Sequence, residues 1–308
     1  MHLATRLPYH TGVVSGEVMT EVAVAADEAG IHSGWVADHI VFPAGELTSR
    51  NTTTASGGYP RPFDEATLES WTCLAYVAGA TKRLGLGVGV CVVPYRNPLI
   101  LAKVIASLDV LSGGRVMCGV GMGWIEQEFD ALQVPFATRR ARLEEGIAMM
   151  RRCWETSPVT FHGQEFRIDE PVHFVPRPTG NVPIIMGGHS APALRRAVAM
   201  ADGWIGHELT PERSAEVRRE LGAAAGGTLP ENFLFVNSRL FNVPGAGAGE
   251  PGRLDITSVA QLADVFAAYD EAGVDILLCE STVRTGDALI RLVHEVQAAG
   301  SRRGLLRV

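Results

Sequence analysis

The chain has 308 residues, of which 46% are hydrophobic and 20% are charged, as is ordinary for a globular enzyme able to bury a large core. Its formal net charge of −7 at pH 7 argues against a nucleic-acid partner. No apolar run approaches the roughly 18 residues of a membrane helix, and the N-terminal sequence MHLATRLPYH lacks the apolar core of a signal peptide. We therefore expect a cytoplasmic protein with no membrane partner.

The N-terminal part of the chain alternates strand and helix patterns. Residues 2–8 predict a strand, and Ser15 can cap a helix that Gly30 ends. Residues 31–39 predict the second strand, which ends in the sequence WVADH. A polar segment rich in Ser, Thr, Gly and Pro follows at 43–64, and a loop of that length in a compact domain is usually functional.

The middle of the chain contains the most regular unit, with strands predicted at 84–93 and 115–121. Between them, Asn97 can cap a helix whose first residue is Pro98, and Gly113 with the next glycine ends that helix. Ligands of such βαβ units bind beyond the carboxyl ends of the strands. Both strand ends carry little side-chain bulk, as a flat cofactor lying against the main chain requires.

The C-terminal half continues the alternation after one interruption, an inserted hairpin and extended segment predicted at 159–178. Further strands are predicted at 182–186, 203–207, 232–243 and 275–279. Eight strands separated by helices predict a (β/α)8 TIM barrel, whereas a doubly wound sheet more often has fewer strands and an early glycine-rich phosphate loop. With no repeat or linker, we expect one domain over 1–308, with insertions after strand two and between strands four and five.

The cysteines do not suggest disulfides or a metal site. There are five, an odd number, without C-x-x-C spacing, and each lies in an apolar pattern: Cys73, Cys91, Cys118, Cys153 and Cys279. We interpret them as reduced core residues. No His/Cys cluster has the spacing of metal ligands, so no metal is expected.

Asp38 and His39 end the second predicted strand, where a barrel places its active site. A carboxylate beside an imidazole can orient it and tune its pKa, which makes a general acid or base. The alternative is a polar pair that caps the strand by bonding to the backbone. Taken alone, the pair favours this structural role, and the catalytic interpretation gains support only because other strand ends agree with it.

The fourth strand ends in glycines at 119, 121 and 123, which resemble a dinucleotide fingerprint. That motif needs a glycine where Trp124 stands and an acidic residue about 20 positions on that closes a strand; both are missing. Two interpretations remain: glycines needed for packing, or backbone that makes room for a planar ring.

The sequence Gly187-Gly188-His189-Ser190 joins a predicted strand to a predicted helix. Backbone N–H groups at such a helix start bind phosphate well. A plain turn is the alternative interpretation.

Together these segments resemble the luciferase-like monooxygenase superfamily, and within it the oxidoreductases that depend on coenzyme F420, a deazaflavin. The resemblance covers nearly the whole chain. The matching sequences are WVADH at 35–39, VPYRNP at 93–98, LDVLSGGR at 108–115, GVGMGW at 119–124, PIIMGG at 183–188 and ADGW at 201–204.

The resemblance implies a TIM barrel that holds the cofactor ring in its mouth, near Asp38 and His39. In F420-dependent members the third strand often carries a non-proline cis peptide behind the deazaflavin, which here would fall at Val90–Cys91. The implied cofactor-binding residues fall into three groups: Asp38 and His39; Val90, Cys91 and Val93; and Gly121 and Met122 along the ring or ribityl chain. Cofactor phosphate is expected at Gly187, Gly188 and His189.

The substrate pocket is expected to include Trp124 and His207. In the sugar-phosphate dehydrogenases of the superfamily a glutamate follows the glycines of strand four, and here Trp124 takes that place. A sugar-phosphate substrate is therefore not expected, and a more apolar pocket is. Glu126 or Glu128 could substitute, although a helix-facing salt bridge is the favoured role for them.

We therefore expect an F420-dependent oxidoreductase that moves a hydride between deazaflavin C5 and a small-molecule substrate. His39 would be the proton-transfer partner, Asp38 would orient the ring or His39, and segment 43–64 would be a lid that excludes water. The rivals are an FMN-dependent monooxygenase that uses O2 and a partner reductase, and a cofactor-binding barrel without turnover. A homodimer is expected from the family.

Overall fold

The computed structural model describes residues 1–10, 14–44, 66–242, 254–281 and 285–306. In these ranges eight parallel strands form a barrel: β1 (His2–Arg6), β2 (Ser33–Val36), β3 (Gly85–Val92), β4 (Val116–Gly121), β7 (Ile184–Gly187), β8 (Gly203–His207), β9 (Leu234–Asn242) and β11 (Ile276–Ser281). The ring closes because β8 pairs with β9 and β11 pairs with β1. The predicted TIM barrel is confirmed.

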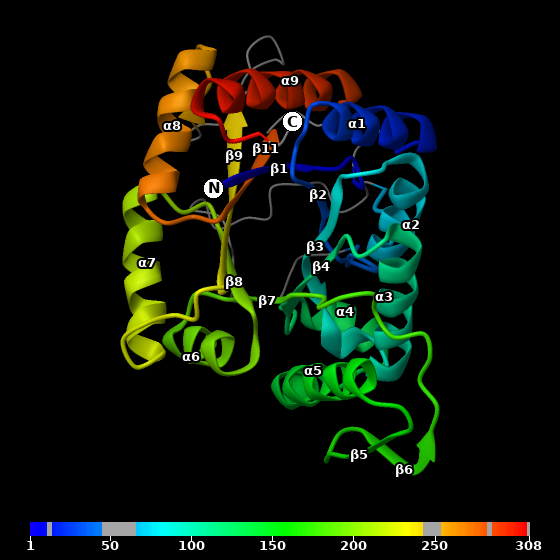
Figure 1. The fold of residues 1–308 in the computed structure, drawn as a ribbon. Coiled ribbons are helices and arrows are strands. Elements are labelled where there is room, and N and C mark those ends of the chain that lie inside the picture. The colour runs from blue at the N-terminus through cyan, green and yellow to red at the C-terminus, as the bar shows by residue number, and fades with distance from the viewer. Residues whose placement is uncertain (11–13, 45–65, 243–253, 282–284, 307–308) are drawn as a thin grey trace.

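Helices surround the barrel, as Figure 1 shows. They are α1 (Gly16–Glu28), α2 (Ser70–Ala80), α3 (Pro98–Ser112), α5 (Arg139–Glu155), α6 (Ala191–Met200), α7 (Pro211–Ala224), α8 (Val259–Glu271) and α9 (Gly286–Arg303). The predicted caps are confirmed: Ser15 accepts from the Val18 amide, and Asn97 accepts from the Leu99 amide. Gly113 ends α3 in the left-handed conformation, with φ 73°.

The insertion between strands four and five is a hairpin of β5 (Val159–His162) and β6 (Arg167–Val172), which extends beyond α5 (Figure 1). The sequence analysis did not identify the short helix α4 (Glu126–Ala131) or the short strand β10 (Leu254–Asp255), nor two 3-10 turns, η1 (Val93–Tyr95) and η2 (Phe136–Thr138). Segment 43–64, the expected lid, lies outside the described residues after position 44.

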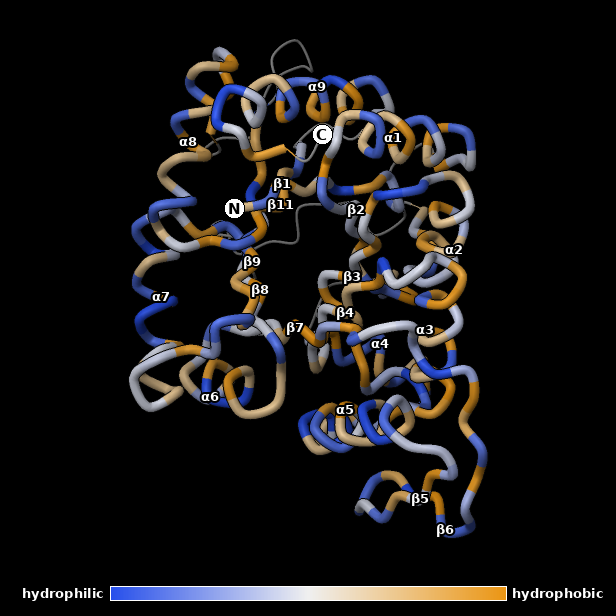
Figure 2. Tube along the Cα trace, in the orientation of Figure 1, coloured by the Kyte–Doolittle hydropathy of each residue, from blue (hydrophilic) through white to orange (hydrophobic). Residues whose placement is uncertain are grey.

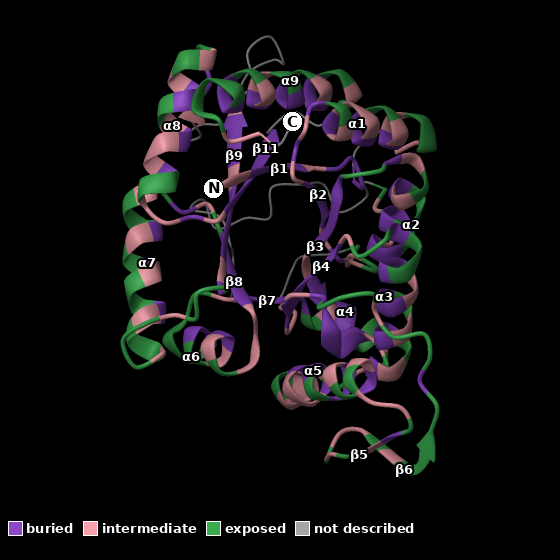
Figure 3. Cartoon of the chain, in the orientation of Figure 1, coloured by how far each residue is buried: buried purple, intermediate pink, exposed green. Residues whose placement is uncertain are grey.

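Apolar side chains form two layers, one inside the barrel and one between the strands and the helices. Figures 2 and 3 show hydrophobic and buried residues along the strands and on the helix faces toward them. All five cysteines lie in the described ranges and are buried with free thiols, as predicted. Within those ranges, none of the helices has both the length and the hydropathy of a bilayer-crossing segment.

Inside the barrel, side chains alternate along each strand, so residues two apart point inward together. The inward cluster is Ala4, Trp35, Met117, Ile185, Ile205, Val236, Ile276 and Leu278. Gly87 makes room for the largest of these, because a Cβ there would lie 2.3 Å from the Trp35 ring. This apolar filling closes the barrel below its mouth.

An ion pair crosses the seam where the first and last barrel strands meet. Arg6 on β1 donates to Glu280 on β11, with Nη2 2.5 Å from Oε1, and the Ser238 hydroxyl on β9 donates to the same oxygen. Burial of Glu280 acts to raise its pKa, but Arg6, with help from His207 and Ser238, outweighs it and lowers the pKa to about 2. The charged carboxylate therefore stabilises the closed barrel.

The seam predicts an acid-sensitive stability. An unfolded glutamate titrates near pH 4.3, so the contribution of Glu280 is complete above that pH and is lost as pH falls toward about 2. The wild type should lose unfolding free energy as pH falls from about 5 to about 3. The double variant Arg6→Met/Glu280→Gln, which lacks both charges, should lose about 2 kcal/mol less over that range. Urea titrations at each pH measure this.

Glu170→Gln, which removes an exposed carboxylate on β6, is the control and should follow the wild-type profile. An unchanged pH dependence in the double variant would show that the seam pair does not contribute this stability.

Candidate active site

The site begins where β2 ends, with the buried carboxylate of Asp38. Each of its two oxygens accepts a hydrogen bond from one terminal nitrogen of Arg96, with both N···O distances 2.7 Å. Oδ2 also accepts a hydrogen bond from the Val92 amide at 2.9 Å. The Ser70 hydroxyl donates to Oδ1 at 3.1 Å. A buried charge needs such donors, and the two-pronged Arg96 contact is the strong geometry for them. Asp38 therefore ties the end of β2 to the end of β3.

The His39 imidazole is held by Glu128 on α4 and not by Asp38. Nδ1 lies 3.1 Å from Oε2 of Glu128, a carboxylate that is 0% exposed. Tyr95 donates its hydroxyl to Oε2 at 2.6 Å, and the Ile40 amide donates to Oε1 at 2.6 Å. Burial acts to raise the pKa of Glu128, but these hydrogen bonds outweigh it and lower the pKa below its ordinary value.

This contact defines the chemistry that His39 can perform. An ionised carboxylate only accepts hydrogen bonds, so Nδ1 of His39 carries the hydrogen directed at Glu128. Any proton exchange with another molecule would then involve Nε2. The arrangement suits a general acid or base whose ring is held in one tautomer.

A salt bridge was expected for Glu128, but sequence reasoning missed that its partner is His39 and that its carboxylate is buried. A signal was present, because Ile125, Glu128 and Phe129 have the spacing of one helix face and all three are 0% exposed. Tyr95 and Arg96 lay within the matching VPYRNP sequence, but their partners could not be identified from it.

The non-proline cis peptide is at Gly89–Val90, one residue before the expected Val90–Cys91. Consecutive Cα atoms are only about 2.9 Å apart across a cis bond, and Gly89 has no side chain to clash there. The β3–β4 register shifts between Val88 and Cys91. After this shift, Cys91 and Val93 pack in the core between strands and helices, away from the mouth.

Val90, in contrast, meets two of the predicted glycines. A Cβ on Gly121 would lie 2.7 Å from one Val90 methyl group, and a Cβ on Gly187 would lie 3.2 Å from the other. Three neighbouring strands, β3, β4 and β7, thus bring Val90, Gly121 and Gly187 together at the carboxyl end of the barrel. The result is a surface made of the Val90 side chain and the backbone at Gly121 and Gly187, where no side chain projects.

The connection from β7 to α6 follows at the same rim. Ser190 caps α6, and Gly188 has φ 119°, a conformation open to glycine. The Trp204 indole donates to the Gly188 carbonyl at 2.8 Å. Desolvation lowers the pKa of the neighbouring His189, and His207 and Arg213 lower it further by repulsion. The His189 imidazole beside these backbone amides therefore favours its neutral form.

The remaining predicted residues divide between the two sides of the mouth. Trp124 lies near His39, with the ring centroids 6.4 Å apart and the planes perpendicular. Met122 is partly buried and packs against the outer core. His207, the last residue of β8, lies four strands from β2 in a ring of eight, and is therefore across the mouth from His39.

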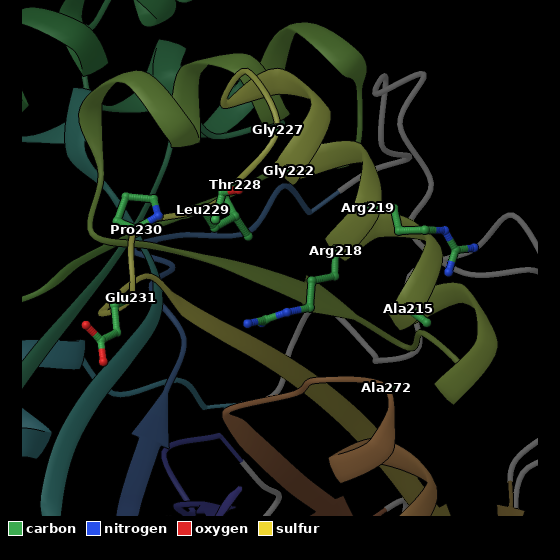
Figure 4. A pocket seen from close by; sticks show the side chains of 10 residues that line it. All are labelled: Ala215, Arg218, Arg219, Gly222, Gly227, Thr228, Leu229, Pro230, Glu231 and Ala272. Carbon is green, nitrogen blue, oxygen red and sulfur yellow. The ribbon is translucent and has the colours of Figure 1, made fainter.

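A groove of about 470 Å³ lies at the other end of the barrel (Figure 4). It is lined by α7 and by the residues that precede β9, among them Arg218, Leu229 and Pro230. The Arg218 guanidinium donates to the Gly273 carbonyl at 2.7 Å, which is a structural contact. The amino-terminal face of a TIM barrel serves stability, so this groove is not the candidate active site.

Residues 3–243 match the family model described as luciferase-like monooxygenase. An uncharacterized protein of Mycobacterium tuberculosis is 32% identical over 244 residues, which cover 78% of this chain and 83% of that protein. The F420-dependent glucose-6-phosphate dehydrogenase of Nocardia farcinica is 32% identical over 219 residues, which cover 68% of this chain and 60% of that protein.

Among solved structures, an F420-dependent secondary alcohol dehydrogenase in complex with an F420-acetone adduct has a TM-score of 0.75. It is 18% identical, with 97% of this chain and 98% of that chain covered, so this likeness shows a shared fold. The resemblance predicted from the sequence is confirmed by the family match, and the chain belongs to the luciferase-like monooxygenase family.

Proposed function

We propose that the protein is an F420-dependent oxidoreductase that moves a hydride between the deazaflavin and a small organic substrate. The observation that carries the proposal is the surface made by Val90, Gly121 and Gly187, with His39 following β2, the strand that pairs with β3. The relationship to F420-dependent glucose-6-phosphate dehydrogenases favours this cofactor.

The residues at the mouth fit such a cofactor. A flat ring needs a flat backing, and a side chain at Gly121 or Gly187 would push Val90 out of the position it holds. The amides at Gly187 and Gly188 suit an anionic phosphate because they lie at the start of α6, where backbone N–H groups and the helix dipole favour negative charge, and His189 beside them can donate a hydrogen bond. When bound, F420 supplies hydride exchange at its C5 atom.

The protein's own part is orientation and proton exchange. The Asp38–Arg96 pair fixes the end of β2, so His39 starts from a rigid position. Glu128 holds Nδ1–H of His39 and stabilises the imidazolium when Nε2 takes a proton. Asp38 thus acts as a positioning residue, and His39 as the proton-exchanging group on the Val90 side of the mouth.

The family also contains monooxygenases, so FMN with O2 and a partner reductase is the alternative cofactor chemistry. The two differ in what the purified protein binds. Protein titrated with each cofactor should quench the fluorescence of F420 with a lower Kd than it shows for FMN.

The same titration tests the backing surface. Gly121→Ala should raise the Kd for F420 about tenfold or more, because the new Cβ would lie 2.7 Å from a Val90 methyl group and must displace it. Gly180→Ala is the matched control, since a Cβ at Gly180 meets nothing within 4 Å, and should bind as wild type does. Tighter binding of FMN than of F420 would contradict the proposal that F420 is the cofactor.

His39→Gln should lower kcat by about 100-fold or more, the usual contribution of a general acid or base, while the Kd for F420 changes little. Glu128→Gln should lower kcat less, since the ring keeps a hydrogen-bond partner but loses the charge behind it. Steady-state kinetics at F420 absorbance measure both. Unchanged kcat in His39→Gln with every substrate turned over would remove His39 from the mechanism.

We further propose that the chain forms a homodimer through the outer faces of α2 and α3, which pack side by side (Figure 1). The sequence of α2 contains no charged residue, and its Tyr76 is 53% exposed. On α3, Ile100 is 63% and Leu111 is 81% exposed, with Val104 between them on the same face. Contiguous exposed apolar surface of this kind usually marks a protein interface.

Leu111→Glu should therefore give a monomer where the wild type is a dimer, because a charge cannot be buried unpaired at an apolar interface. Light scattering coupled to size-exclusion chromatography reads the mass directly. Ala298→Glu, on the exposed side of α9, introduces the same charge away from α2 and α3 and should leave the dimer intact. A wild-type monomer, or a dimer that persists in Leu111→Glu, would contradict this interface.

A further inference from the structure

The inward-facing residues at the mouth differ between the two halves of the barrel. Above the apolar cluster, β3, β4 and β7 place Val90 and two glycines. The next four strands around the ring, β8, β9, β11 and β1, are polar at the same level. Because side chains alternate, the polar residues lie two positions beyond inward core residues: His207 after Ile205, Ser238 after Val236, Glu280 after Leu278 and Arg6 after Ala4.

These four side chains form one continuous hydrogen-bonded row. Arg6 donates to Glu280 with Nη2 2.5 Å from Oε1, and the Ser238 hydroxyl donates to that oxygen as well. His207 Nδ1 lies 3.2 Å from Ser238 Oγ. Ser238 is 3% and Glu280 is 6% exposed, whereas His207 is exposed at the strand end. The row therefore begins at the barrel wall and reaches the mouth at His207.

The chemistry of the row fixes which nitrogen of His207 carries hydrogen. Glu280 is ionised, with a pKa of about 2, and can only accept. The Ser238 hydroxyl has one hydrogen, which it gives to Glu280, so its oxygen can only accept from the imidazole. Nδ1 of His207 is then the donor, and Nε2 is the position at which a proton is gained or lost.

We propose that His207 exchanges the proton at the reacting oxygen of the substrate, and that this substrate is a neutral alcohol or carbonyl compound. The inference rests on the proposed function, which supplies the deazaflavin as hydride acceptor or donor. The charges of Arg6 and Glu280 neutralise one another, so this wall suits a hydroxyl or carbonyl group and not a phosphate or carboxylate.

In the oxidative direction the substrate C–H bond breaks and its electron pair leaves as hydride to the oxidised deazaflavin. The O–H bond breaks, its proton goes to Nε2 of His207, and the C=O bond forms. Reduction is the reverse. His39 lies four strands away on the Val90 side, so the two imidazoles occupy opposite sides of the mouth.

The titratable groups around His207 belong to four elements. Glu280 and Arg6 lie behind Ser238 on β11 and β1, while His189 follows β7 and Arg213 is on α7. Arg213 is paired with Glu216 and Glu220.

The tautomer can be tested without cofactor. In 15N-histidine-labelled protein at about pH 8, the His207 resonances, assigned by their loss in His207→Gln, should show Nε2 without hydrogen. Ser238→Ala should shift His207 toward a mixture of tautomers, since the acceptor for Nδ1–H is gone. A wild-type His207 that carries its hydrogen on Nε2 overturns the proposal.

The catalytic role needs the loaded enzyme. Wild type and His207→Gln are compared with a panel of primary and secondary alcohols under F420, and the matching aldehydes and ketones under reduced F420. His207→Gln should lower kcat/KM about 100-fold and remove one limb of its pH profile, with the Kd for F420 within about threefold of wild type. Ser238→Ala should retain that limb at a shifted pH.

His173→Gln is the control, because His173 Nδ1 also lies near a serine hydroxyl, Ser157, at 3.5 Å, but on the exposed hairpin region. Its kinetics should match wild type. A large rise in the Kd for F420 with kcat unchanged would make His207 a cofactor ligand and overturn the proposal, as would turnover of anionic substrates only or of no panel member. Failure of wild type to bind F420 would instead contradict the proposed cofactor, and the tautomer measurement stands apart from it.

Discussion

The bonding of one buried carboxylate, Asp38, determines the shape of the mouth. Asp38 takes two hydrogen bonds from Arg96 and one from the Val92 amide, so the ends of β2 and β3 are joined immediately beside the shifted register of β3. Val90 lies within that shift and His39 follows Asp38 directly. In the proposed function, ring backing and proton exchange would therefore depend on the same anchor.

The mouth contains two imidazoles that are each held by a buried carboxylate, one directly and one through a hydroxyl group. His39 is held directly by the Glu128 carboxylate, whereas His207 is held by Glu280 through the Ser238 hydroxyl. In each case a charge behind the ring sets the tautomer and leaves Nε2 as the exchanging position. The proposed hydride reaction between a cofactor and an alcohol would involve two proton movements, and two separately held imidazoles suit that requirement.

The fold could be predicted from the sequence because its signals are local. Apolar runs, the caps at Ser15 and Asn97 and the glycine stop at Gly113 each act within a few residues. The meeting of Val90, Gly121 and Gly187 followed from barrel topology, since the carboxyl ends of neighbouring parallel strands share one rim.

The pairings at the site could not be predicted in the same way. The contact between Asp38 and Arg96 joins residues 58 apart, and that between His39 and Glu128 joins residues 89 apart. Each depends on where a side chain points after its strand or in a one-turn helix. The shift near Val88 also changes which side chains face inward, and for this reason Cys91 and Val93 turned to the outer core.

Glu128 serves two parts of the molecule at once. Besides His39 it accepts the backbone amides of Ile40 and Val41, so it fixes the chain that leaves the barrel after His39. The partner of the His39 imidazole and the path of that chain are thus set by a single side chain from α4. Loss of the Glu128 carboxylate would therefore disturb the backbone after β2 and the position of the His39 ring together.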